Sequence, residues 1–171
     1  MTLLAACARR LCLHESAHAV AFLHFGAVPL RVAWGFRAGG LTVGPKIPSE
    51  QWLVVLEAGE LGVELFEQIS SLQAPANFPA RRFLPEPAED ASVPSDALAT
   101  AAITDAGRKK RDIVDFVRQK KIVADARHAA RAILLDNSEC VLCMAQALIN
   151  SGELRREEIL RIWSDSLNDE L

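Results

Sequence analysis

The feature that most constrains the fold is a polar pentapeptide in the middle of a long apolar stretch. Residues 3–25 are almost continuously apolar or small apart from Arg9, Arg10 and the segment around His14, and no Gly or Pro occurs before Gly26. This pattern predicts a buried helix. Two histidines and a carboxylate inside a protein core destabilise it unless a partner satisfies them. The chain must therefore fold around a central helix whose polar groups have such a partner.

The pentapeptide at residues 14–18 reads His-Glu-Ser-Ala-His, which is the HExxH pattern. Residues four apart on a helix share one face, so the imidazoles of His14 and His18 can reach the same metal ion. Glu15 lies about 100° further round the helix axis, where its carboxylate can take a proton from a water that Zn²⁺ activates. We predict that His14 and His18 bind zinc and that Glu15 is the general base. The alternative is a satisfied polar cluster without a metal.

A catalytic zinc ion has three protein ligands and one open position, so a third ligand must come from elsewhere in the chain. His24 falls on roughly the opposite side of the helix, and His128 lies among Ala and Arg residues that predict a solvated position. Asp96 follows a predicted helix start, where backbone N–H groups hold a carboxylate, and Glu64 stands in an apolar helical segment. Either could be the third ligand. The alternatives are a plain helix cap for Asp96 and an ion pair at the core edge for Glu64.

The rest of the chain predicts one mainly helical α+β domain over residues 1–171, with a small sheet beside the HExxH helix. The β-prone runs 28–34 and 41–43 are separated by Gly39 and Gly40, which predict a turn in a hairpin or between two edge strands. A proline-rich loop is expected at about 74–94, and Gly152 is expected to end a helix. Helices are predicted at about 51–72, 95–106, 108–117, 121–135, 138–150 and 155–167.

Composition and charge argue against several classes of function. The 171 residues carry a formal net charge of −3, which gives no chain-wide attraction to nucleic acid or to an anionic membrane. The basic residues at 108–111 and 120–121 alternate with aspartates and predict a solvated helix face. No apolar run approaches the roughly 20 residues of a membrane-spanning helix. Arg9 and Arg10 follow the first apolar residues instead of preceding them, which is the wrong order for a secretory signal.

The four cysteines form no framework of spaced pairs, so we expect reduced thiols and a cytoplasmic location. Cys140 and Cys143 are separated by two residues within an apolar helical run. Without a second such pair they cannot complete a tetrahedral structural metal site. We predict two small buried thiols at these positions.

His-Glu-Ser-Ala-His-Ala-Val at residues 14–20 resembles the zinc helix of the FtsH-type ATP-dependent proteases, which usually reads His-Glu-Ala-Gly-His-Ala. The Gly-Gly-Leu-Thr-Val-Gly run at 39–44 and the helical segment 52–66 are similar to the family's next segments. Ser95-Asp96 resembles the helix start that supplies the family's third zinc ligand. The resemblance thus implies a zinc metalloendopeptidase with Asp96 as third ligand, although Ala17 replaces the usual Gly.

FtsH proteases carry an ATPase module and membrane helices before the peptidase, whereas thirteen residues precede His14 here. Residues 39–46 are not a phosphate loop, because Pro45 splits the required Gly-Lys pair and Ile47 stands where Ser or Thr must bind magnesium. We therefore expect a peptidase domain that stands alone and hydrolyses unfolded or flexible polypeptides without ATP. The alternative is a non-catalytic binding or regulatory module that keeps the zinc site. The resemblance is compatible with a homo-oligomer and with a separate unfoldase partner.

Overall fold

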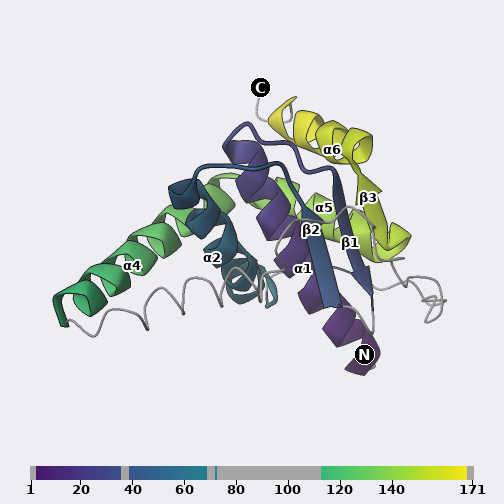
Figure 1. Ribbon diagram of the computed structural model, residues 1–171. Helices are drawn as coiled ribbons and strands as arrows, with labels where there is room; N and C mark the ends of the chain where they lie inside the picture. Colours follow the sequence, from purple (N-terminus) through teal and green to yellow (C-terminus); the bar gives the residue numbers. More distant parts are fainter. Residues whose placement is uncertain (1–2, 36–38, 69–71, 73–112, 169–171) are drawn as a thin grey trace, which may run out of the picture.

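The computed structural model describes residues 3–35, 39–68, 72 and 113–168. These residues form five helices and one small sheet, so the predicted mainly helical α+β class is confirmed (Figure 1). Outside the described residues lie the predicted loop at 74–94, the predicted helix at 95–106 and Asp96. The elements in chain order are α1 (Leu3–His24), β1 (Arg31–Gly35), β2 (Gly39–Val43), α2 (Ser49–Phe66), α4 (Ile113–Asp136), α5 (Ser138–Ser151), β3 (Glu153–Arg155) and α6 (Arg156–Asn168).

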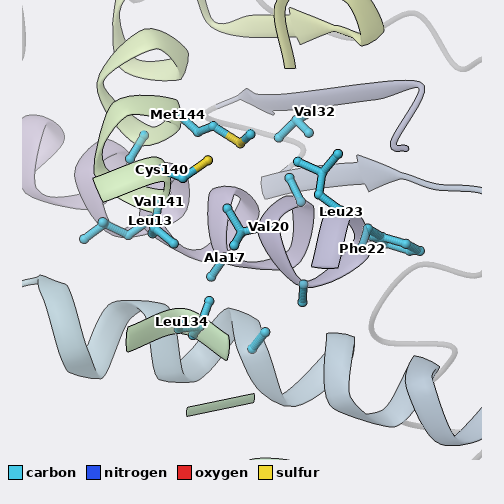
Figure 2. Close-up of a cluster of buried hydrophobic side chains, with 14 of the residues drawn as sticks. Leu13, Ala17, Val20, Phe22, Leu23, Val32, Leu134, Cys140, Val141 and Met144 are labelled. Carbon is cyan, nitrogen blue, oxygen red and sulfur yellow. The ribbon is translucent and has the colours of Figure 1, made fainter. Parts of the chain in front are cut away.

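Helix α1 is the central element, as its apolar sequence predicts. It contacts α2, α4, α5 and both strands of the hairpin, and it crosses the middle of the fold (Figure 1). From Cys12 to Leu23 every described residue except His14 is buried. Figure 2 shows Cys140, Val141 and Met144 of α5 on one side of α1, and Leu134 of α4 on the other. Burial of aliphatic side chains stabilises the apolar part of this core.

The sheet lies beside α1 and has the strand order β2-β1-β3, with both pairings antiparallel. The predicted hairpin is confirmed, but the predicted role of two glycines in its turn is wrong. Gly39 and Gly40 belong to β2, where they pair with Gly35 and Trp34. Residues 28–30 precede β1, so the first strand is also shorter than predicted. The third strand was not predicted, because three residues are too few to show an alternating pattern.

Two helix boundaries differ from the prediction. Helix α2 ends at Phe66 instead of near residue 72, since an apolar period does not by itself place the end of a helix. The helices predicted at 108–117 and 121–135 are one helix from residue 113 onwards, α4. The break predicted between them falls at the polar residues Arg118, Gln119 and Lys120, but all three are good helix formers and no Gly or Pro interrupts them.

The C-terminal part follows the prediction closely. Helix α5 ends at Gly152, which has a left-handed backbone with φ of 79° and donates its N–H to the Leu148 carbonyl at 2.8 Å. Helix α6 then packs on α5 and β3. Within the described residues no single helix is long and apolar enough to cross a membrane. The segments Gln119–Asp136 and Ser138–Ser151 pass such a test only together, and they meet at an angle of 81°.

Candidate metal centre

The orientation of His18 is fixed by a backbone carbonyl of α2. Its Nδ1 atom lies 2.7 Å from the Val55 carbonyl oxygen, and the side chain is only 2% exposed. A carbonyl oxygen can only accept, so Nδ1 carries the hydrogen. In the neutral ring Nε2 then bears the lone pair, which is the tautomer that binds a metal through Nε2. The hydrogen bond to Val55 therefore makes Nε2 the atom through which His18 can bind a metal.

His14 lies one helical turn earlier and faces the same point. The two Nε2 atoms are 3.0 Å apart, and the rings are almost perpendicular, at 88°, with centroids 4.5 Å apart. Two nitrogens bound to one tetrahedral zinc ion, each at about 2.0–2.1 Å, would lie about 3.3 Å from each other. A small adjustment of the imidazoles would accommodate a zinc ion. Both histidines that the motif predicts as ligands thus fit a shared cation.

Because Gly59 of α2 has no side chain, the two imidazoles can occupy the space next to its backbone. A Cβ atom at this position would lie 2.5 Å from His14 Cε1 and 2.5 Å from His18 Nε2, which real side chains do not tolerate. One turn further along α2, a Cβ on Gly62 would overlap Ala17. These glycines let α2 approach α1 closely enough for the Val55 carbonyl to reach His18. Glycine in a helix interior is otherwise unfavourable by about 1 kcal/mol relative to alanine, so the packing accounts for its presence.

Glu15 contacts the hairpin. Its side chain is 3% exposed, and its Oε2 atom accepts a hydrogen bond from Thr42 Oγ1 of β2 at 2.6 Å. Gly40, two residues earlier on β2, lies against the carboxylate, because a Cβ there would overlap Oε1. The general base predicted from the motif is thus a buried carboxylate in contact with the edge strand.

A pocket of about 490 Å³ opens beside the motif, within the usual range of roughly 300–1,000 Å³ for ligand sites. It lies between α1, α2 and β2, and both His14 and Glu15 line it. Arg10 and Glu64 also line it, but each already has a partner, Glu67 for Arg10 and Arg127 for Glu64. A ligand in this pocket can therefore reach the imidazole and the carboxylate together.

Among the described residues, neither candidate for a third ligand is seen to join His14 and His18. Asp96, the preferred candidate, lies outside the described residues. Glu64 is 56% exposed, and both of its oxygens accept from Arg127 of α4, at 2.6 and 2.7 Å. The ion pair weighed as an alternative for Glu64 is therefore present. In the described part of the chain, no group of three or more His, Cys, Asp and Glu side chains could hold a metal.

The other two histidines and the four cysteines differ in their exposure to solvent. His128 is exposed, as predicted, and His24 is exposed as well. Burial, and then the charge of Glu15, raise the pKa of the Cys12 thiol far above its usual range, so this neighbour of the motif stays protonated. Burial likewise raises the pKa of Cys140 to about 11. Cys143 is exposed, so the prediction of two buried thiols is wrong for this residue, which turns towards solvent three positions along the helix.

Thr42, Gly40 and Gly59 contribute to the site but were not predicted to do so. Each acts through a contact with a residue at least 25 positions away in the sequence, and such contacts leave no local pattern. The isolated glycine in an apolar helix was the one available signal, because it often marks a close approach. For Thr42 no sequence signal was present.

Comparison with models of protein families finds no match to this sequence, and comparison with curated proteins also finds none. The likeness to the FtsH-type peptidases therefore rests on the motif and on the order of the segments that follow it.

Proposed function

We propose that this protein is a zinc metalloendopeptidase that hydrolyses peptide bonds in unfolded or flexible polypeptides, with an FtsH-peptidase-like fold. The observation that carries the proposal is the pair of Nε2 atoms 3.0 Å apart, with His18 oriented by the Val55 carbonyl, beside the carboxylate of Glu15 in one pocket. A hydrogen bond between the two Nε2 atoms would also satisfy a metal-free cluster with the same His18 tautomer, so the access of His14 and Glu15 to the pocket is what favours the metal. Zinc binding alone does not need Glu15.

His14 and His18 would hold the zinc ion, and the resemblance supplies Asp96 as the third ligand. When bound, zinc would polarise the scissile carbonyl and lower the pKa of water towards about 7. Glu15 accepts the proton of the attacking water and afterwards returns it to the nitrogen of the leaving amine, as a general base and then a general acid. The pocket between α1, α2 and β2 receives the polypeptide next to this carboxylate.

The class of substrate follows from the absence of a phosphate loop in this sequence. A folded protein hides its peptide bonds behind a global stability of about 5–15 kcal/mol, so only disordered or locally unfolded segments reach the site without a motor. We propose that this chain acts without ATP and that a separate unfoldase, if present, would extend its substrates. None of the four cysteines forms a disulfide, which supports a reducing, cytoplasmic setting.

Three measurements on the purified protein test the proposal together. Metal analysis should find one zinc per chain, and a fluorescently labelled disordered polypeptide should be cut, with cleavage abolished by a chelator and restored by zinc. A tightly folded substrate should be spared, and ATP should change neither result. Bound zinc without cleavage would favour the non-catalytic binding module instead. Stimulation by ATP would contradict the assignment of this chain as ATP-independent.

A further inference from the structure

The hairpin contacts the catalytic motif through one face of β2. Side chains alternate between the two faces of a strand, so Gly40 and Thr42 share a face while Leu41 belongs to the other. Both contact Glu15: Gly40 lies against Oε1, and Thr42 Oγ1 lies 2.6 Å from Oε2. Strand β2 thus packs directly against the carboxylate of Glu15.

The Thr42 hydroxyl has a single hydrogen and two acceptors on Glu15 within reach. The backbone carbonyl of Glu15 is 3.2 Å away and Oε2 is 2.6 Å away. A separation of about 2.5–2.7 Å is typical of a hydroxyl that donates to an ionised oxygen, and such bonds are roughly twice as strong as neutral ones. The hydrogen is therefore directed to the carboxylate.

The strand itself is held firmly in place. Thr42 pairs with Val32 in β1, the central strand, whose other edge pairs with β3. Val32 is almost completely buried. Because the donor is fixed by the sheet and the acceptor by α1, the bond restricts the side-chain rotamers of Glu15.

We propose that Thr42 is a positioning residue that holds the carboxylate of Glu15 in the orientation needed for proton transfer. Thr42 does not line the pocket, whereas Glu15 and Gly40 do, so the hydroxyl acts from behind the carboxylate and does not touch the substrate. This inference rests on the proposed peptidase function.

The kinetic test compares Thr42→Val, which keeps the shape and removes the donor, with Thr42→Ser, which keeps the hydroxyl. In Thr42→Val, kcat should fall by about 10-fold to 100-fold, the usual effect of losing a hydrogen bond that orients an active-site group, while KM changes by less than about threefold. Thr42→Ser should recover most of the lost kcat. Leu41→Val, on the other face of β2, is the control and should keep the parent kcat. An unchanged kcat in Thr42→Val, or equal losses in the Val and Ser variants, would overturn the proposal.

A stability cycle tests the hydrogen bond without reference to catalysis. Denaturant midpoints are measured for the parent, Thr42→Val, Glu15→Ala and the double variant. Thr42→Val should lower the midpoint in the parent background and have a much smaller effect when Glu15 is already alanine. Equal effects in both backgrounds would show that the two side chains do not interact, which overturns the proposal. Coupling in a protein that cleaves no polypeptide would instead show that the bond exists and that the peptidase function, with the catalytic role of Thr42, is wrong.

Discussion

Helix α1 packs against α2 and against α5, and these two contacts are built differently. Towards α5 the contact is made of ordinary apolar side chains, among them Cys140, Val141 and Met144 (Figure 2). Towards α2 the contact also contains apolar side chains, but it includes two imidazoles, a backbone carbonyl and glycines that allow a close approach. The first contact depends on buried area and the second on the position of a few atoms. Substitutions on the two sides should therefore affect different properties.

The largest loss of stability is expected on the α5 side. Met144 is completely buried, so Met144→Ala should lower the free energy of unfolding by about 2–5 kcal/mol through lost transfer energy and the cavity left behind. Denaturant unfolding measures this, and the zinc content of the folded protein should not change. Leu160→Ala on the outer face of α6 is a matched control and should change stability by less than about 0.5 kcal/mol. Loss of zinc from folded Met144→Ala would show that the contact between α1 and α5 also affects zinc binding.

On the α2 side, Gly59→Ala should reduce both stability and zinc affinity. The new methyl group would overlap both imidazoles, and overpacking of this kind destabilises by about 1–3 kcal/mol. The control is Gly62→Ala, whose methyl group overlaps Ala17 and not the histidines. Both variants should unfold at lower denaturant concentration, but only Gly59→Ala should bind zinc more weakly in a competition titration. Equal zinc affinities in the two variants would contradict the account of Gly59.

The third ligand can be identified by a pair of carboxylate variants. Asp96→Asn should weaken zinc binding by at least about 10-fold, the loss that even outer-shell changes commonly produce. Glu64→Gln should have a smaller effect on zinc, because its carboxylate pairs with Arg127 and is half exposed, where an ion pair contributes up to about 1 kcal/mol of stability. The reverse order of the two zinc affinities would make Glu64 the ligand and Asp96 a helix cap.

The smallest effect is expected at Ser16, a residue of the motif that is proposed neither as a metal ligand nor as the general base. The Ser16 hydroxyl is fully buried and has no hydrogen-bond partner among the described residues. Replacement by alanine removes a group that lost its hydration on folding, so Ser16→Ala should raise the free energy of unfolding by about 1 kcal/mol. Chemical denaturation measures the change, and zinc affinity should stay the same. A decrease in stability would mean that the hydroxyl has a partner after all.

The sequence predicted those parts of the fold whose signals are local. The apolar run around His14 predicted α1, and the apolar run before Gly152 predicted α5 and its end at this glycine. The HExxH spacing predicted that two imidazoles share one point and that Glu15 faces elsewhere. Geometry along a single helix is sufficient for each of these.

The parts that could not be predicted depend on contacts between distant segments. Gly39 and Gly40 have the composition of a turn, yet they lie in β2, where Gly40 lets the strand pass close to Glu15. The bond from Thr42 to Glu15 joins residues 27 positions apart, and the contact of Gly59 with the histidines joins α2 to α1. Hydrophobic periodicity carries no information about these pairs, so only the structure reveals them.

The central claim is that His14 and His18 hold zinc while Glu15 supplies the base. The most direct test is Glu15→Gln, which keeps both imidazoles and the shape of the side chain but cannot accept the proton. This variant should retain one zinc per chain and cleave a disordered polypeptide about 10²-fold to 10⁴-fold more slowly than the parent, whereas His14→Ala and His18→Ala should lose the metal. Cleavage by Glu15→Gln at the rate of the parent would contradict the account.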